Sequence, residues 1–138
     1  MKGDAASIHA LARKPRPDIR LYLIFGTDDG GNAALVSEIV ASFPKGAERT
    51  DIDGHQLAKD PSLLAAEAAS LSLFGDARYI RVTTSGEESL PAVEALLAAD
   101  KTVNPVVMLA SSVTDKSRIA KAVLAAPNAL AVQTKTPG

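Results

Sequence analysis

Residues 21–35 read LYLIFGTDDGGNAAL, and this stretch decides the fold that the sequence predicts. The run at 21–25 is apolar throughout and is bounded by charge and by Gly26, which is typical of a strand covered on both faces of a parallel sheet. From 31 to 43 apolar residues recur at helical spacing, and Pro44 ends the segment. The sequence therefore predicts a central buried strand, a tight turn and a helix.

Strand and helix patterns continue to alternate along the rest of the chain. Short apolar or alternating runs predict further strands at 48–52, 78–82, 106–109 and 129–132. Helical patterns lie between them at 61–70, 88–98 and 116–124. Strands alternating with helices of this length require right-handed crossovers, which place helices on both faces of a sheet. We therefore expect an α/β fold, a three-layer sandwich with a mainly parallel five-stranded sheet.

The 138 residues are expected to contain one large domain. Residues 1–20 read as a leader helix, capped by Asp4 and running to about Arg13, and a proline-rich linker; residues 21–138 form the domain. Hydrophobic residues make up 46% of the chain and charged residues 22%, a globular balance. No apolar run is long enough to cross a bilayer or to act as a secretory signal, so a cytoplasmic location is expected.

The composition also bounds the chemistry. The chain has no cysteine, which excludes disulfides, thiolate metal sites and cysteine nucleophiles. His9 and His55 are far apart, with no ligand spacing around them and no evident serine and acid partners. A net charge of −1 gives no overall basic field for nucleic acid. The sequence therefore predicts no catalytic residue, no metal site and no cofactor.

The glycine loop has part of the pattern of a phosphate-binding loop, G-x-x-x-x-G-K-[ST]. Gly26 and Gly31 have the required spacing. Asn32 and Ala33 then occupy the positions of the lysine that binds the β and γ phosphates and of the hydroxyl that binds magnesium. We interpret the loop as degenerate and unable to bind a nucleotide, with a degenerate P-loop nucleotide-binding protein or ATPase as the alternative.

Two aspartates, Asp28 and Asp29, follow the first strand within this loop. Their charge opposes that of a bound phosphate, and either one is suited to cap the helix. An acid pair here is also found in phospho-acceptor receiver domains, which need a third aspartate at the end of the third strand. After 78–82 no carboxylate occurs until Glu87, and Asp53 ends the second strand instead. The receiver interpretation is therefore disfavoured.

Residues 70–74 read SLSLF and do not fit the helix that precedes them. In a continuous helix Leu71 would extend the apolar stripe, whereas Leu73 and Phe74 would lie on other faces. In an extended chain Leu71 and Leu73 share one side and Phe74 points to the other. Two interpretations follow: Phe74 enters a second core layer of a scaffold domain, or the apolar side chains form an exposed hook for a partner.

This SLSLF segment resembles the Q-L-S-L-F type of peptide by which bacterial replication proteins bind the hydrophobic groove of the sliding clamp. Four of its five positions match, with serine where glutamine is commonest: Ser70, Leu71, Ser72, Leu73 and Phe74. Its surroundings resemble the same family: an apolar strand ending in G-x-D, an Ala/Leu-rich helix, the run SLFGDARYIRV, and a helix with Lys116, Arg118 and Lys121. Over essentially the whole chain, this order is similar to the N-terminal domain of the delta subunit of the bacterial DNA polymerase III clamp loader.

The resemblance implies an AAA+-like, P-loop NTPase fold without a functional Walker A motif. It implies binding of the sliding clamp (beta subunit), with Leu73 and Phe74 as the hook, and opening of the ring for loading onto DNA during replication, without ATP. Such a domain is no enzyme by itself but part of the polymerase III holoenzyme. The chain would be an N-terminal fragment, joined to other clamp-loader subunits through domains absent here, with DNA a possible partner in the full complex and no membrane.

Two positions depart from the family pattern. Ser70 lacks the amide of the usual glutamine, and with it a hydrogen bond to the clamp. Gly30 and Gly31 replace larger residues early in the helix, which should weaken its first turn by about 1 kcal/mol per glycine relative to alanine.

Overall fold

The computed structural model describes residues 1–11, 13–14, 16–71 and 77–134. Its strands form a single sheet in the spatial order β1-β6-β2-β5-β4-β3, and every pairing is parallel. The strands are Lys2–Gly3 (β1), Leu21–Gly26 (β2), Glu48–Asp53 (β3), Arg78–Thr84 (β4), Val106–Ala110 (β5) and Ala129–Thr134 (β6). The helices are Ala5–Ala10 (α1), Asp29–Ala41 (α2), Gly54–Lys59 (α3), Ser62–Ala69 (α4), Leu90–Ala98 (α5) and Arg118–Ala125 (α6), with a 3-10 turn at Glu87–Ser89.

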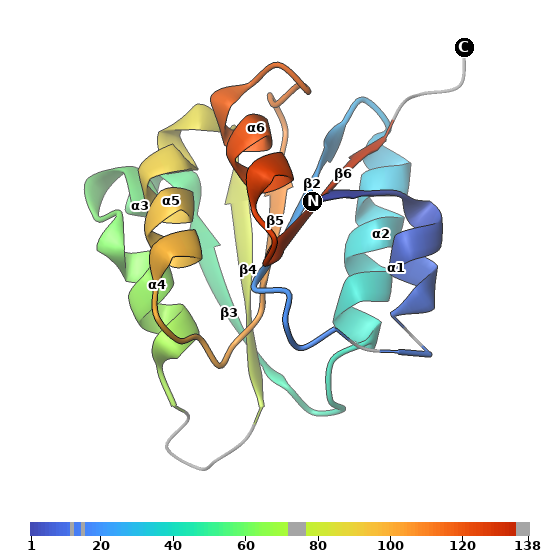
Figure 1. Ribbon diagram of the computed structural model, residues 1–138, viewed down its shortest axis with the longest axis horizontal. Helices are drawn as coiled ribbons and strands as arrows, with labels where there is room; N and C mark the ends of the chain where they lie inside the picture. The colour runs from blue at the N-terminus through green and yellow to red at the C-terminus, as the bar shows by residue number, and fades with distance from the viewer. Residues whose placement is uncertain (12, 15, 72–76, 135–138) are drawn as a thin grey trace.

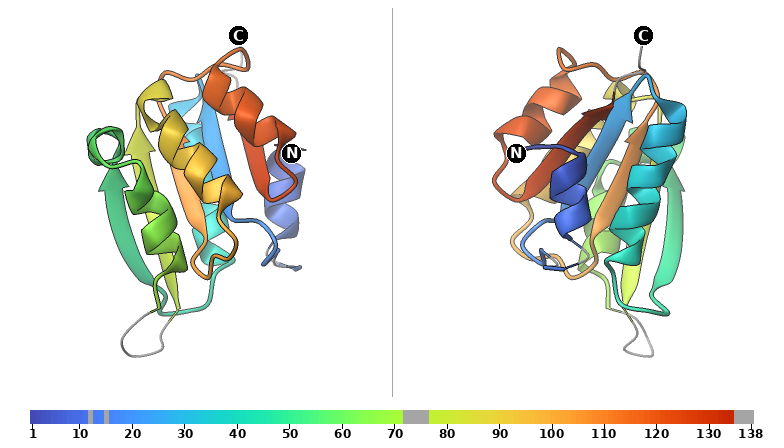
Figure 2. Two further views of the ribbon diagram at one scale, coloured as in Figure 1. Left: turned by 60° about the vertical axis from the view of Figure 1, so that its left-hand side comes forward. Right: turned by 90° about the vertical axis from the view of Figure 1, so that its right-hand side faces the viewer.

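Helices cover both faces of the sheet, so the three-layer α/β arrangement predicted from the sequence is present (Figure 1). Helices α1 and α2 pack on one face, and α3, α4, α5 and α6 pack on the other, as the two views of Figure 2 show. Each face has its own cluster of buried apolar side chains. The sheet is therefore the middle layer between two hydrophobic cores.

Strand β2 lies inside the sheet between β6 and β5, and its side chains enter both cores. Leu21, Leu23 and Phe25 pack on the side of α3 to α6, whereas Tyr22 and Ile24 pack on the side of α1 and α2. All five are buried. Because fully burying one such side chain is worth about 1.5–3 kcal/mol, this uninterrupted apolar run gives the centre of the fold a strong driving force.

The sheet has six strands in the described residues, so the prediction of five is wrong. All five expected strands are present, and the additional one is β1, which pairs with β6 at the edge of the sheet. It is two residues long, too short to show an alternating pattern. Distant contacts fix it instead: the Met1 amino group donates to the carbonyl oxygens of Val123, Ala126 and Ala129 at 2.8, 2.9 and 2.6 Å.

Residues near the N-terminus, expected as a leader helix and linker, contribute to the same fold as the rest. Helix α1 is shorter than expected and begins with a capping box, in which Asp4 accepts from the Ser7 backbone N–H at 2.8 Å. Ile8, Leu11 and Ile19 are buried in the core shared with α2. This segment therefore provides one edge strand and part of one helical layer.

The strand order separates the fold from that of receiver domains. Numbering the five longer strands along the chain gives the spatial order 5-1-4-3-2. The flavodoxin-like order that receiver domains share is 2-1-3-4-5, in which the first strand lies between the second and third. Here the first of these strands, β2, lies between the fourth and fifth. The topology therefore agrees with the sequence in disfavouring a receiver domain.

Candidate functional site

The SLSLF segment begins where α4 ends, at the edge of the sheet where the strands start, here called the amino edge (Figure 1). Helix α4 stops at Ala69, and Ser70 has an extended backbone with ψ of 134°. The apolar stripe of α4 ends with it: Leu64 and Ala68 are fully buried, whereas Leu71 is 79% exposed. Of the predicted clamp-binding residues, Ser70 and Leu71 are described, and Ser72, Leu73 and Phe74 lie outside the described residues.

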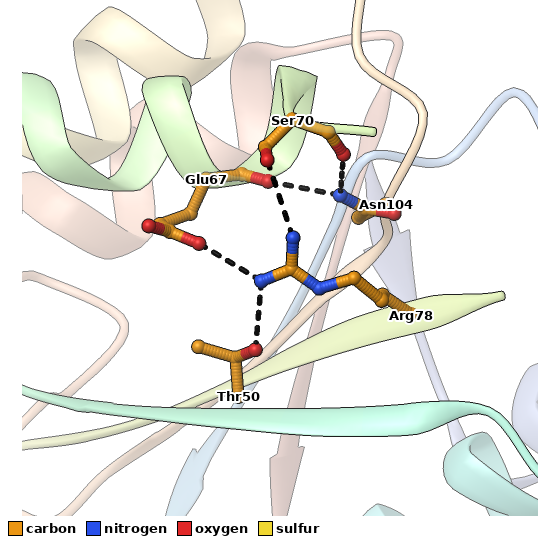
Figure 3. A network of polar contacts seen from close by, with 5 residues as sticks. All are labelled: Thr50, Glu67, Ser70, Arg78 and Asn104. Atoms are coloured by element: carbon orange, nitrogen blue, oxygen red, sulfur yellow. Dashed lines mark hydrogen bonds and ion pairs between the residues drawn. The ribbon is translucent and has the colours of Figure 1, made fainter. Parts of the chain in front are cut away.

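Arg78, the first residue of β4, is bound to the end of α4 (Figure 3). Its guanidinium donates to Ser70 Oγ at 3.2 Å, to Thr50 Oγ1 at 2.9 Å and to Glu67 Oε2 at 2.9 Å. The arginine side chain is only 13% exposed. A buried charge is costly unless it is paired and hydrogen-bonded, and these three partners, on β3, on α4 and directly after α4, meet that need.

Asn104, just before β5, also binds this helix end (Figure 3). Its side-chain amide donates to the carbonyl oxygens of Glu67 at 2.9 Å and Ser70 at 2.7 Å. The backbone N–H groups of Val103 and Asn104 both donate to the Ala68 carbonyl oxygen, at 2.8 and 2.9 Å. The last carbonyls of a helix have no partner within the helix, so the 103–104 loop caps α4.

These contacts fix both flanks of residues 71–77. Ser70 precedes this stretch and Arg78 follows it, and the two are hydrogen-bonded to each other. The Ser70 hydroxyl, at the position where glutamine is usual in the resembling peptides, therefore has a role inside the domain. The sequence analysis missed Thr50, Glu67, Arg78 and Asn104. The only local signal was the position of Arg78 in the run SLFGDAR, because the four residues come from separate segments.

The glycine loop lies at the opposite edge of the sheet, where the strands end, here called the carboxyl edge (Figure 1). Gly26 has a φ of 129°, and a Cβ added there would overlap the carbonyl oxygen of Thr134. Asp28 caps α2: its carboxylate accepts from the Gly31 N–H at 3.0 Å, and its carbonyl oxygen accepts from the Asn32 N–H at 2.8 Å. The Asp28 carboxylate thus occupies the helix end that would attract an anion.

Asn32 and Ala33 stand where a nucleotide-binding loop has lysine and a hydroxyl residue. The first is buried and the second is exposed. Asn32 is 4% exposed. Its amide donates to the Gly26 carbonyl oxygen at 3.2 Å, and its Oδ1 accepts from Thr134 Oγ1 at 2.6 Å. Ala33 is exposed on α2. Asn32 therefore ties the start of α2 to the ends of β2 and β6.

Glu88 organises a second polar cluster at the carboxyl edge, after β4. Its Oε1 accepts from Thr84 Oγ1 at 2.8 Å, from the Ser85 N–H at 2.9 Å and from the Ser85 hydroxyl. The Ser85 hydroxyl, the Thr84 hydroxyl and the Ser85 N–H stabilise the carboxylate and lower the pKa of Glu88 to about 2. The charged form is thus held by neighbouring groups in the loop.

The two histidines lie on different helices. His9 Nδ1 lies 2.9 Å from Glu38 Oε2 and links α1 to α2, and His55 is exposed on α3. Among the described residues, no group of three or more histidine, aspartate or glutamate side chains is placed to hold a metal ion. None of the described helices combines the length and the apolar character needed to cross a membrane.

The sequence matches no protein-family model and no curated protein. The resemblance to the delta subunit is therefore carried by the SLSLF segment and its neighbouring motifs alone.

Proposed function

We propose that this chain is the clamp-binding domain of a clamp-loader delta subunit. It binds the bacterial sliding clamp through the SLSLF segment and helps to open the ring for loading onto DNA during replication, without binding ATP. The observation that carries this proposal is the geometry at the end of α4. Leu71 is 79% exposed directly after a residue whose hydroxyl and carbonyl are both held inside the domain.

The anchored flanks favour recognition of a partner by a short segment. Fixing a flexible segment on binding costs conformational entropy, about 1–2 kcal/mol for the backbone of each residue. Arg78 and Asn104 hold both ends of the 71–77 stretch before any partner arrives. Restricting the ends reduces the entropy lost on binding, which is the general benefit of preorganisation.

The carboxyl edge supports a function that needs no nucleotide. A phosphate loop binds through free backbone N–H groups and a lysine. In this loop the Gly31 N–H is bound to Asp28, and Asn32 is buried against Thr134. We infer an AAA+-like domain that keeps the glycine loop as a structural turn. The alternative, a degenerate P-loop ATPase, gains no specific support from these contacts.

In the proposed assembly, the sliding clamp (beta subunit) is the direct partner of this domain. The other clamp-loader subunits bind through domains outside this chain, and any contact with DNA belongs to the full complex. The chain is then a non-catalytic part of the DNA polymerase III holoenzyme.

A binding experiment with a competing peptide tests the proposal. A bacterial sliding clamp is immobilised and the chain is passed over it without nucleotide, with a Q-L-S-L-F peptide as the competitor. We expect saturable binding that the peptide displaces, whereas a peptide with alanine for the second leucine and the phenylalanine does not. Binding that ignores the Q-L-S-L-F peptide would show that the contact lies elsewhere, and absence of binding would refute the proposal.

A further inference from the structure

A second exposed apolar side chain lies beside the SLSLF segment. Among the described residues, the large hydrophobic side chains exposed to solvent are Leu71 at 79% and Val103 at 45%. They come from distant parts of the sequence, but the hydrogen bonds from the 103–104 loop to Ala68 and Ser70 hold their segments together. Two separate segments thus present an apolar surface at the same edge of the sheet.

Val103 also forms part of the wall of a cavity of about 440 Å³. The other walls come from the rest of the 102–105 segment, from the segment before and at the start of β2, and from the residues directly after α2, and they include Tyr22, Phe43 and Pro44. The rings of Tyr22 and Phe43 lie 6.4 Å apart between centroids. Asn104 lines the same cavity and binds the Ser70 carbonyl oxygen at 2.7 Å, so the cavity and the SLSLF segment share a residue.

The charges at this cavity favour an apolar guest over an anion. Arg16 is held by Asp18 through two hydrogen bonds of 2.9 and 2.7 Å. Arg20 donates to the carbonyl oxygens at the end of α5, those of Leu96, Ala99 and Asp100. The two guanidinium groups in the lining therefore have partners already. The cavity also lies at the amino edge, whereas small ligands of open α/β sheets bind outside the carboxyl ends of the strands.

We infer that Val103 and this cavity form a second contact for the protein that binds the SLSLF segment, and that the cavity receives an apolar side chain of that protein. The inference rests on the proposed function and identifies the partner as the sliding clamp. A stable interface buries about 800 Å² on each partner, more than a five-residue segment supplies alone. A protein seated on Leu71 would reach Val103 next, because the two segments are bonded together.

Three variants of the full chain test the inference by their affinity for the clamp. Val103→Asp places a charge in the apolar contact, and Thr102→Trp fills the cavity, since Thr102 lines it. Ala34→Asp is the matched control, because Ala34 is exposed in the first half of α2 and does not line the cavity. We expect binding to weaken about tenfold or more in the first two variants and to stay unchanged in the third.

The possible outcomes separate the second contact from the proposed function. Thermal midpoints should stay within a few degrees of wild type, because surface substitutions usually change stability by about 0.5 kcal/mol or less. If Val103→Asp unfolds the domain, Val103→Ser takes its place, with an expected loss of about fivefold. Wild-type affinity in the Val103 and Thr102 variants would overturn the inference and leave the proposed function standing. No binding by the wild-type chain would overturn both.

Discussion

The loop after β2 and the chain after α4 lie at opposite edges of one sheet, and they use their side chains differently. At the carboxyl edge, Asp28 and Asn32 bind groups within the loop and on β6. At the amino edge, Arg78 and Asn104 likewise bind internal partners, but Leu71 remains exposed. The difference lies in what is left for a ligand. In the glycine loop the Gly31 N–H and the Asn32 side chain already have partners within the domain, whereas the end of α4 presents an exposed apolar side chain.

The glycine spacing therefore has a structural explanation. Gly26 is required because the backbone approaches Thr134 too closely for a side chain and has a φ of 129°. Gly31 lies against the Asp28 carboxylate that caps α2. A motif search detects the spacing but does not detect which groups already have partners.

The largest expected effect is at the amino edge, in the double variant Leu73→Ala with Phe74→Ala. If both side chains enter the clamp groove, each contributes about 1.5–3 kcal/mol, so the affinity should fall by roughly two to four orders of magnitude. The thermal midpoint should stay within a few degrees of wild type. A large fall in the midpoint would instead indicate core residues, for which such truncations cost about 2–5 kcal/mol each.

At the carboxyl edge, Gly26→Ala should destabilise the domain severely. The strained backbone costs about 1–3 kcal/mol and the overlap with Thr134 about as much again, so we expect a loss of roughly 2–6 kcal/mol in the free energy of unfolding. Gly30→Ala is the control: its Cβ would meet only Asp28 Oδ1, at 3.8 Å, and α2 should gain about 0.5–1 kcal/mol. Denaturant unfolding measures both. Equal stability of the two variants would contradict the structural role of Gly26.

Arg78→Met breaks the network that holds the end of α4. Hydrogen bonds to charged groups are worth about 1.5–3 kcal/mol, and we expect a stability loss in that range because Glu67 loses its partner. Clamp affinity should fall as well, since the flanks of the 71–77 stretch are released. Arg49→Met is the control: that arginine is 50% exposed and pairs with Asp51 at 3.2 Å, a surface pair worth at most about 1 kcal/mol. If Arg78→Met keeps full clamp affinity in its folded form, the hydrogen bonds of Arg78 do not contribute to clamp binding.

The pH dependence of stability should reveal the Glu88 cluster. The pKa of Glu88 is lowered to about 2 in the folded protein, so its carboxylate favours the folded state above the ordinary glutamate pKa of 4.5. This contribution is lost as the pH falls from about 4.5 to about 2. In Glu88→Gln the thermal midpoint should therefore fall less steeply over this range than in wild type. Identical slopes would mean that the cluster does not hold the carboxylate in solution.

The smallest expected effect is none at all. Restoring a lysine and a threonine with Asn32→Lys and Ala33→Thr should not create ATPase activity, because Asp28 still occupies the Gly31 N–H and the loop keeps both of its aspartates. Phosphate release is measured at a temperature where the variant remains folded, since Asn32 is a buried contact. Turnover above background would show that the loop is nearer to a nucleotide site than its contacts indicate.

The sequence predicts the parts of this fold that depend on local pattern. The continuous run of β2 and the periodic apolar residues of α2 were sufficient to place both elements. Helix α3 was missed because it has six residues and a single buried large side chain, Leu57; its signal is the capping box of Asp53 and Gln56. Strand β1 is fixed by its pairing with β6 and by a hydrogen bond from the Met1 amino group to Val123, on the helix before β6. No local sequence pattern reveals these contacts.

The candidate site was likewise predictable only where its signal is local in the sequence. The SLSLF segment was visible because its apolar residues do not fit the helix before it. The hydrogen bonds that hold the end of α4 were not visible in the sequence. Their residues Thr50, Arg78 and Asn104 meet α4 only once β3, β4 and β5 are assembled side by side. The sequence left open whether Leu71 continues the apolar stripe of the helix. In the structure α4 ends at Ala69, and Leu71 is exposed.

Clamp binding is measured most simply by an equilibrium titration of a bacterial sliding clamp with this chain, without nucleotide, at low and moderate salt. We expect saturable binding whose affinity changes little with ionic strength, because the contact is apolar. A steep loss of affinity with salt would contradict the apolar contact and move it to the exposed cations Lys116, Arg118 and Lys121. Absence of saturable binding would refute the assignment to the clamp loader.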